Sequence, residues 1–424
     1  MSTANSFQEP IGVKFIFRAL KYRNYRLFFG GQSISLIGTW MQQAAMGWLV
    51  YRITGSAFLL GAVEFCSTIP IFFLTPFVGV LADRWNRHRM VIAIQSLAML
   101  QAFMLALLTL LGSIAVWQII SLSLFLGFIN TFDTPVRQSF VMDMIERRED
   151  IGNAIALNSS LFNLARLIGP SLAGLVIAAT GEGICFLLNG VSYIAVIVAL
   201  FAMRIRPILK ANARTYMSQD IKEGFSYTFG FAPIRDILLL LGLVSMIGTP
   251  YAVLMPIFAK DIFHGGPNTL GFLMGGVGVG ALIGAFFLAS RKSVRGLERT
   301  IPVALAIFAS GLISFSFSRI FPLSLFILVF CGFGIMVQMA SSNTVLQSVA
   351  DDDKRGRVMS YYTFAFRGTA PIGSLLAGTL ASKIGAPWTI FIGGGFCLVG
   401  AYLFMHKLPE LQRVIQPIYD KKLL

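Results

Sequence analysis

The chain has 424 residues, of which 56% are hydrophobic and 12% are charged, and its mean hydropathy is +0.75. Soluble domains carry roughly 25% charged residues, so this composition excludes a soluble protein and predicts an integral membrane protein. The net charge of +15 does not indicate nucleic-acid binding, because the basic residues lie in short gaps between long apolar runs rather than on one water-facing surface.

Long apolar stretches recur along the whole chain. A helix needs ~20 mainly apolar residues to cross the hydrocarbon core of a bilayer. We therefore predict an all-α membrane protein whose twelve spans lie at 27–50, 57–82, 90–112, 115–140, 153–179, 183–203, 236–259, 269–290, 301–318, 322–349, 358–382 and 387–405.

The loops between these spans predict the orientation, because the cytoplasmic loops of membrane proteins are enriched in Lys and Arg. When the N-terminus is placed in the cytoplasm, 28 of the 34 basic residues fall in the inner connections and the chain ends, and only 4 fall in the outer connections. We therefore expect a multi-pass protein with both termini in the cytoplasm.

Two segments at the inner side have amphipathic patterns. Ile221, Phe225 and Phe229 recur every four residues among charged neighbours, and residues 14–26 alternate in the same way. Such patterns are typical of helices that lie on a membrane surface. The domains that follow are an amphipathic N-terminal segment at 1–26, a six-helix bundle at 27–203, a linker with an amphipathic helix at 204–235, a second six-helix bundle at 236–405 and a cytoplasmic tail at 406–424.

The two predicted bundles resemble each other. In span five Arg166 precedes Pro170 by four residues, and in span eleven Arg367 precedes Pro371 by the same interval. Parallel six-helix repeats related by an axis along the membrane normal are a transporter architecture. The repeat therefore predicts a transporter with two pseudo-symmetric halves.

The connection between spans two and three carries a specific motif. Its sequence, GVLADRWNRHR at 79–89, resembles the signature loop of the major facilitator superfamily, which is written GxLADRxGRK. Asn86 stands where the family prefers glycine, and His88 replaces a basic residue. Because asparagine tolerates a left-handed backbone, we expect the turn at this position to be kept.

Further stretches resemble one branch of that superfamily, the macrolide-efflux and enterobactin-exporter group of the drug:proton antiporters. They are FRALKYRNYRLFFGGQSISLIGTWMQQAAMGWLVYRITGS at 17–56, PVR at 135–137 and RGRVMS at 355–360, together with a Gly-Pro signature within 166–174. The resemblance covers nearly the whole chain. It implies the superfamily fold, secondary active transport, a bacterial inner or plasma membrane and a monomer.

The resemblance also implies a cytoplasmic gate. The family's pattern makes Gly79 the point where span two approaches span eleven, and Asp83 the cap of span eleven, where the helix dipole favours a carboxylate. Arginines of the loop would pair with acids at the foot of span four and hold the inner side shut. Asp133 and Arg137, which are four residues apart, are expected to pair with each other. The predicted gate residues are Gly79, Asp83, Arg84, Arg87, Asp133, Arg137 and Asp143.

Three charged residues lie within the spans at depths where a charge costs at least ~2.5–3.5 kcal/mol to insert. We predict that Glu64 carries the proton, with Arg166 or Arg367 as its partner. Depth in the membrane favours Arg166, and the expected contact between spans two and eleven favours Arg367. A permanent ion pair is one alternative. Another is that the two guanidinium groups hold an anionic substrate, such as a catecholate or carboxylate siderophore.

Helix-breaking and polar residues suggest a hinge and a cavity. Gly169 and Pro170 are expected to interrupt span five, where a bend would help the halves to rock. Small residues such as Gly174 also permit close helix packing, so a hinge role and a packing role both stay open for these residues and for Pro371. The candidates for the lining of the substrate cavity are Gln32, Trp40, Gln42, Gln43, Trp48, Tyr251, Gln338 and Asn343.

The function that the resemblance implies is proton-coupled export of an amphipathic small molecule, such as a drug, a macrolide or a siderophore, by alternating access. An importer or flippase of a siderophore or lysophospholipid is an alternative, and a non-transporting membrane sensor is another. We expect no enzyme and no cofactor, because nucleophile motifs and phosphate-binding loops are missing, and no metal site, because the cysteines lack CxxC spacing. The expected partners are the substrate, protons and the lipid bilayer, and not nucleic acid.

Overall fold

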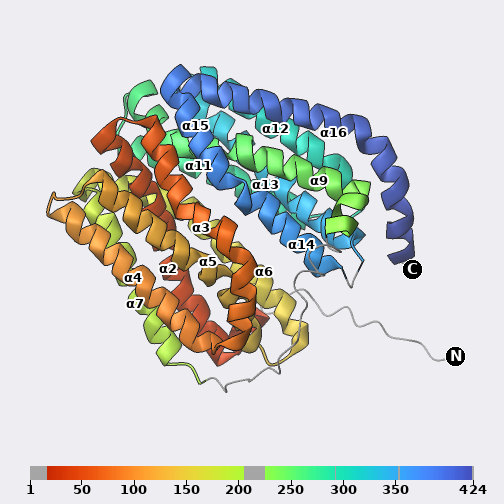
Figure 1. The fold of residues 1–424 in the computed structure, drawn as a ribbon, viewed down its shortest axis with the longest axis horizontal. Helices are drawn as coiled ribbons and strands as arrows, with labels where there is room; N and C mark the ends of the chain where they lie inside the picture. The colour runs from red at the N-terminus through yellow and green to blue at the C-terminus, as the bar shows by residue number, and fades with distance from the viewer. Residues whose placement is uncertain (1–16, 205–224, 292, 352–353, 423–424) are drawn as a thin grey trace.

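The computed structural model describes two groups of helices. It covers residues 17–204, 225–291, 293–351 and 354–422, without the side chains of 75–84, 421 and 422. The first group begins with a short 3-10 helix and contains η1 (Arg18–Lys21), α2 (Arg23–Thr54), α3 (Ala57–Arg84), α4 (Arg87–Leu110), α5 (Val116–Asp143), α6 (Arg148–Thr180) and α7 (Glu182–Phe201) (Figure 1).

The second group contains more breaks than the first. Its elements are α9 (Ala232–Leu243), η2 (Val244–Gly248), η3 (Thr249–Leu254), α10 (Met255–Ile257), η4 (Phe258–Ile262), α11 (Pro267–Ala289), α12 (Leu297–Phe317), α13 (Phe321–Val349), α14 (Arg355–Thr363), η5 (Phe364–Gly368), α15 (Ala370–Ile384) and α16 (Ala386–Lys422). We call the two groups the N-bundle and the C-bundle.

Helical segments occupy all twelve predicted span positions, and ten of those in the described chain are long and apolar enough to cross a membrane. The segment α2 is long enough, but Thr39, Gln42 and Gln43 lower the mean hydropathy of its middle below that of a typical membrane span. The other exception is α14–α15, which the π-helical turn η5 divides into two short helices. Both exceptions carry residues that prove important for the site.

The expected interruption of span five was wrong. Helix α6 runs without a break from Arg148 to Thr180 although Pro170 lies inside it. In membranes neighbouring helices and small local adjustments accommodate an internal proline. The breaks lie instead in span seven, from η2 to η4, and in span eleven, where Pro371 starts α15 at a position that does not need a backbone N–H donor.

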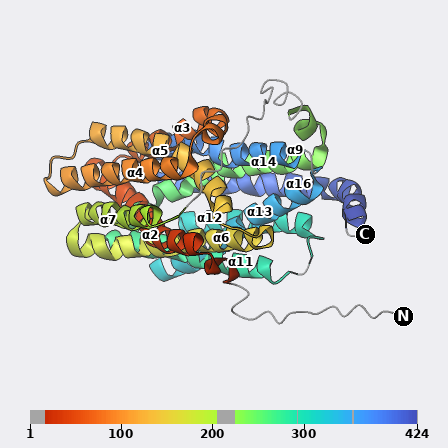
Figure 2. The ribbon, with the colours of Figure 1, turned by 90° about the horizontal axis from the view of Figure 1, so that it is seen from below.

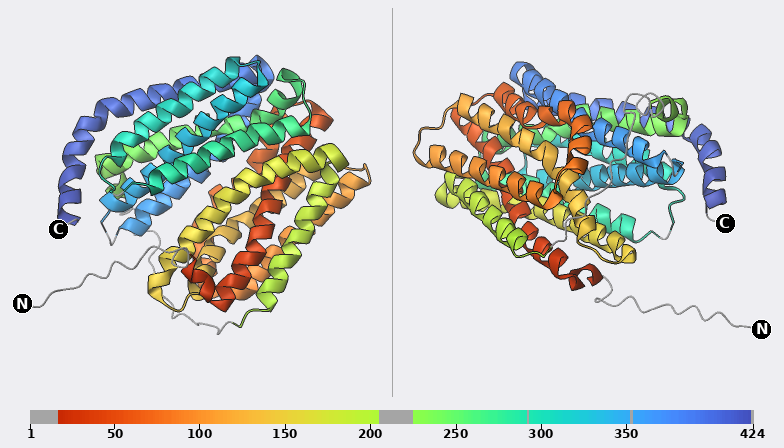
Figure 3. Two further views of the ribbon diagram at one scale, coloured as in Figure 1. Left: turned by 180° about the vertical axis from the view of Figure 1, so that it is seen from behind. Right: turned by 60° about the horizontal axis from the view of Figure 1, so that its bottom comes forward.

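Helix α16 is longer than the predicted span, because it continues through the expected tail to Lys422. Its last part is amphipathic, and Leu411, Ile415 and Tyr419 are buried at intervals of four residues. Asp420 receives a hydrogen bond of 2.5 Å from Arg295. The tail therefore packs on the C-bundle. Figures 1 and 3 show that it turns away from the rest of the helix, and internal prolines are the usual cause of such a bend.

The described part of the N-terminal amphipathic segment packs on protein. Arg18 Nε and Lys21 Nζ lie 3.0 and 2.7 Å from the two carboxylate oxygens of Asp150 in α6, and Tyr22 donates a hydrogen bond of 2.7 Å to the same group. The hydrogen bond of the Lys21 ammonium group to Asp150 raises the pKa of Lys21. Residues 14–16 lie outside the described part of the chain.

The amphipathic part of the linker also contacts the C-bundle where it is described. The rings of Phe225 and Phe229 stack 4.5 Å apart, and Phe229 meets Tyr361 of α14 edge-on at 5.9 Å. Ile221 lies outside the described residues. At least two aromatic side chains of this segment therefore face protein rather than lipid alone, which differs from the expectation.

The two bundles converge at one end. Successive helices run in opposite directions, so the loops rich in Lys and Arg lie at one end of each bundle; we call this end the basic face and the other end the opposite face. The helices splay toward the basic face and come together toward the opposite face (Figure 1; Figure 3 shows this from behind). Seen from below, α4 and α7 lie at one end of the molecule and α16 reaches the other (Figure 2).

Glycines permit the close approach of the bundles near the opposite face. A Cβ atom on Gly61 of α3 would lie 3.0 Å from the Cα atom of Gly378 in α15. A Cβ atom on Gly174 of α6 would lie 3.0 Å from the Cα atom of Gly271 in α11. Contacts between spans two and eleven and between spans five and eight are those that the superfamily resemblance implies.

Candidate functional site

A cavity of about 350 Å³ lies between the two bundles. Its walls come from α2, α3, α5 and α6 of the N-bundle and from η3, α10, α11 and α15 of the C-bundle. Pockets for small organic molecules measure about 300–1,000 Å³, so the volume suits such a ligand. The polar and aromatic residues of the wall include Trp40, Gln42, Gln43, Glu64, Arg166 and Tyr251.

The structure places four of the eight predicted cavity residues in this wall, namely Trp40, Gln42, Gln43 and Tyr251. The other four lie outside it. Gln32 and Trp48 are buried among the N-bundle helices, and Gln338 is fully buried within 3.4 Å of the Ser342 hydroxyl. Asn343 accepts a hydrogen bond of 2.5 Å from Gln347 on its own helix. These positions share the residue types of the wall but do not line this cavity.

Glu64 and Arg166 line the same cavity from α3 and α6. No ion pair joins them, and none joins Glu64 to Arg367, within the part of the chain that the structure describes. The guanidinium group of Arg166 lies 5.7 Å from the centre of the Trp40 ring, which is a cation–π contact. Glu64 and Arg166 therefore line one cavity without forming an ion pair.

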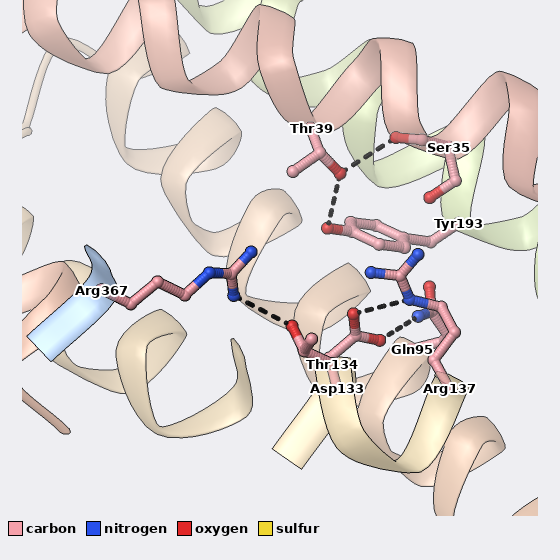
Figure 4. Close-up of polar contacts among 8 residues, drawn as sticks. All are labelled: Ser35, Thr39, Gln95, Asp133, Thr134, Arg137, Tyr193 and Arg367. Atoms are coloured by element: carbon pink, nitrogen blue, oxygen red, sulfur yellow. Dashed lines mark hydrogen bonds and ion pairs between the residues drawn. The ribbon is translucent and has the colours of Figure 1, made fainter. Parts of the chain in front are cut away.

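A polar cluster, shown in Figure 4, lies beside the cavity on the side of the basic face. Asp133 accepts hydrogen bonds of 3.0 Å from Arg137 and of 3.0 Å from Gln95. Arg367 approaches from the C-bundle and donates a hydrogen bond of 3.2 Å to the hydroxyl of Thr134. The predicted pair of Asp133 and Arg137 is thus confirmed, whereas the contact of Arg367 with α5 rather than with Glu64 was not expected.

Sequence reasoning missed the neutral members of this cluster. Gln95 lies inside an apolar span, which was a usable signal, but Thr134 and Tyr193 have no distinguishing pattern around them. The hydroxyl groups of Thr39 and Tyr193 lie 3.3 Å apart, and Thr39 also lines the cavity. The cluster is therefore connected to the cavity wall through α2.

Two predicted gate residues meet at the basic face. Arg87, at the start of α4, donates hydrogen bonds of 3.0 and 3.1 Å to the carboxylate of Asp143 at the end of α5. The side-chain placements of Asp83 and Arg84, and the surroundings of Gly79, lie outside the described part. The expected left-handed turn at Asn86 was wrong. Its φ is −67°, and its side chain instead accepts a hydrogen bond of 3.1 Å from the backbone of Arg89, as an N-cap does.

The predicted hinge residues serve close packing. A Cβ atom on Gly169 would lie 2.5 Å from Cβ of Trp40, so this glycine lets α6 approach α2. A Cβ atom on Gly174 would lie 2.7 Å from the backbone oxygen of Pro267 in the other bundle. Pro170 lines the cavity. Because α6 is unbroken, the geometry favours packing over bending for these three positions, while Pro371 follows the real break at η5.

A buried hydrogen-bond network positions one wall residue. Gln42 donates a hydrogen bond of 3.0 Å to Gln101 of α4 and accepts one of 2.8 Å from Asn189 of α7. Gln101 and Asn189 are both fully buried. Such a network fixes the rotamer of its members, because a buried amide without its partner is costly. The orientation of Gln42 at the cavity is therefore set by α4 and α7.

Comparisons with known proteins agree with this arrangement. The family described as transmembrane secretion effector matches residues 16–419. The Staphyloferrin A transporter of Staphylococcus aureus is 24% identical over 91% of this chain and 97% of its own. Macrolide efflux protein A of Streptococcus pyogenes is 25% identical over 88% of this chain and 94% of its own. The multidrug efflux pump Tap of Mycolicibacterium fortuitum is 24% identical over 88% of this chain and 93% of its own.

Solved structures share the fold. A POT family transporter superposes with a TM-score of 0.72 at 12% identity and covers 92% of this chain and 96% of that one. The nucleoside transporter NupG gives a TM-score of 0.66 at 14% identity, and the match covers 91% of this chain and 98% of NupG. At these identities the likeness concerns the arrangement of helices alone.

Proposed function

Because this chain belongs to the transmembrane secretion effector family of the major facilitator superfamily and is a membrane transporter, we propose that it exports an amphipathic small molecule in exchange for protons. The names of its relatives, which include a macrolide efflux protein, a multidrug efflux pump and a siderophore-type transporter, support a drug, a macrolide or a siderophore as the substrate. The membrane would be the bacterial inner or plasma membrane, with a single copy of the chain as the working unit.

The observation that carries the proposal is a cavity whose wall is shared by two bundles, which pack closely on each other near the opposite face in the described part of the chain. Near the opposite face Gly61 and Gly378 bring α3 and α15 together, and the bundles splay toward the basic face. With the basic face in the cytoplasm, as its Lys and Arg content predicts, the cavity would load from the cytoplasm. Rocking of the bundles about the cavity would then expose it to the outside.

Glu64 is the proposed proton carrier. Its side chain lies at the wall of the cavity, so a cavity that opens to each side in turn would let this carboxyl group take up a proton outside and release it inside. Arg166 on the facing helix would stabilise the deprotonated form whenever the two side chains approach. The domains proposed to move against each other are residues 27–203 and 236–405.

Transport in inside-out membrane vesicles tests the export proposal. An acidic lumen should drive accumulation of a radiolabelled macrolide or of ethidium inside vesicles that contain the protein, and an uncoupler should abolish it. Movement of both probes out of the lumen would instead indicate import, and no movement of either under a gradient would contradict the proposal.

The variant Glu64→Gln tests the coupling residue. It should abolish accumulation driven by the pH gradient and leave probe binding intact, because the amide keeps the shape but cannot take up and release a proton. Glu146→Gln is the matched control, since Glu146 is exposed in the loop between α5 and α6. Gradient-driven accumulation by Glu64→Gln at the rate of the control would remove the assignment.

A further inference from the structure

The polar cluster beside the cavity carries more positive than negative charge. Its two arginines, Arg137 and Arg367, stand against a single carboxylate, that of Asp133 (Figure 4). Arg137 Nε lies 3.0 Å from Oδ2 of that group, and Gln95 donates to Oδ1 at 3.0 Å. Both oxygens of the carboxylate therefore already have hydrogen-bond donors, and neither donor is Arg367.

Arg367 is the charge that this arrangement leaves without a matching anion. Its hydrogen bond to the Thr134 hydroxyl joins the two bundles, but the hydroxyl is neutral. Among the described residues no carboxylate oxygen lies within 4.0 Å of its guanidinium nitrogens. A charged group at membrane depth is costly unless it has a partner or serves a ligand.

The two guanidinium groups point toward one another across the bundle interface (Figure 4). Like charges that converge repel each other, and an anion between them would replace repulsion with attraction. Each guanidinium offers five N–H donors in a planar fork, which suits the two oxygens of a carboxylate. The hydrogen bonds to Asp133 and Thr134 use few of them.

A ligand in the cavity can reach this cluster. Asn130, one turn before Thr134 on α5, and Ala370, three residues after Arg367, both line the cavity. One turn before Arg367, the ring of Phe364 lies 5.3 Å from the ring of Phe72 in α3. An elongated molecule in the cavity would thus have the cavity wall along its body, and two arginines beyond its end nearer the basic face.

We propose that Arg367 and Arg137 bind the acidic group of the transported molecule, so that amphipathic anions, and carboxylates in particular, are bound more tightly than uncharged or cationic substrates. This inference rests on the proposed export function, which makes the ligand a transported small molecule, and it narrows the chemical class of that molecule. Arg166 is not part of this site, because it lies on α6 with its guanidinium group over the ring of Trp40.

Binding of a matched pair of fluorescent probes tests the site in the full-length protein in lipid nanodiscs. Dansyl-phenylalanine carries a carboxylate, and dansyl-phenylalaninamide has the same shape without the charge. The wild-type protein should bind the carboxylate about tenfold more tightly than the amide. Arg367→Gln should lose this preference without weakening amide binding, and Arg367→Lys should keep part of it, since the charge remains but the fork is lost.

Arg319→Gln is the control, because Arg319 lies at the opposite face and bonds only to the backbone oxygens of Ser316 and Ser318 in the described structure. It should keep the wild-type preference. Wild-type protein that binds both probes equally, or Arg367→Gln protein that still prefers the carboxylate, would overturn the assignment. Where Arg367→Gln does not fold, Arg367→Met replaces it, because methionine keeps an unbranched side chain.

The binding readout separates this inference from the export proposal. A carboxylate preference that depends on Arg367, in a protein that moves neither probe in sealed vesicles, would uphold the anion site and count against export. Export of the amide and the carboxylate at equal rates and affinities would uphold export and count against the anion site.

Discussion

The phenolic oxygen of Tyr51 donates a hydrogen bond to the carboxylate of Asp261, and this bond joins the N-bundle to the C-bundle at the opposite face. Tyr51 is buried at the end of α2, whereas Asp261 in η4 is exposed. The ammonium group of Lys260 lies 5.5 Å from the centre of the Tyr51 ring. We call these three residues the opposite-face latch, because they join the two bundles at the end through which an exported molecule would leave.

Removing the latch hydroxyl should favour states that are open at the opposite face. A hydrogen bond to a charged group contributes about 1.5–3 kcal/mol, and tenfold in a population is about 1.4 kcal/mol, so Tyr51→Phe should raise the open population by about tenfold or more. The measurement is the rate at which a membrane-impermeant maleimide, added from that side, reacts with Ala252→Cys in the cavity wall. The four native cysteines would be replaced beforehand.

Tyr402→Phe is the control for this substitution, since Tyr402 is exposed on α16 and its ring contacts only His406 among the described aromatic neighbours. A labelling rate for Tyr51→Phe equal to that of Tyr402→Phe would show that the latch does not bias the equilibrium.

The glycine contact between the bundles should not tolerate a methyl group. A Cβ atom on Gly378 would lie 2.7 Å from the backbone oxygen of Ala57 and 2.9 Å from the Cα atom of Gly61. Backbone atoms at this distance must move, so Gly378→Ala should wedge the opposite face apart and lower the transport rate about tenfold or more.

Gly395→Ala is its control, because Gly395 lies within α16 and a Cβ atom there meets nothing within 4 Å. Alanine in a helix interior stabilises by about 0.5–1 kcal/mol relative to glycine, so this variant should keep its transport rate and melt no lower than the wild type in detergent. Equal transport by the two variants would contradict the close packing of α3 on α15.

The amide network around Gln42 should contribute to stability as well as to binding. Asn189→Ala removes the donor to Gln42 and leaves a buried amide oxygen without a partner, which costs about 1–3 kcal/mol. The free energy of unfolding, measured by titration with a denaturing detergent, should fall by that amount. Asn163→Ala should change it by less than about 0.5 kcal/mol, since Asn163 bonds only to a backbone oxygen on its own helix in the described structure. An equal loss of unfolding free energy in the two variants would show that the network around Gln42 does not stabilise the fold.

The positions of the spans could be predicted, because the length of an apolar run reports directly on its ability to cross a bilayer. The breaks at η2 to η5 could not, since hydropathy is insensitive to whether a residue adopts an α or a π turn. The continuation of α16 to Lys422 was missed for a related reason. Its last turns are amphipathic, and Leu411 and Ile415 are buried against protein, which a search for uniformly apolar segments overlooks.

The site could be predicted in part. Glu64, Arg166 and Arg367 stood out because charges within spans are rare. Their neighbours depend on how each helix is rotated and tilted. The rotation of a helix about its axis decides whether Arg367 contacts Glu64 or Thr134, and the sequence does not report that rotation. Asp133 and Arg137 could be paired in advance, because four residues bring two side chains to the same face of one helix.

Distances between spin labels test the central claim that two bundles rock about a shared cavity. One pair of nitroxides, on Gly152→Cys and Gly356→Cys, reports on the basic face, and a Cβ atom on either glycine meets nothing within 4 Å. A second pair, on Ala179→Cys and Gly266→Cys, reports on the opposite face, where both residues are exposed.

The distances are measured by pulsed electron–electron double resonance in nanodiscs. One measurement is made without substrate at neutral pH, and a second with a transported probe at acidic pH. Rocking predicts that the basic-face distance shortens as the opposite-face distance lengthens, with the populations changing together. Distances that stay fixed in both pairs, or that lengthen together, would contradict alternating access in this protein.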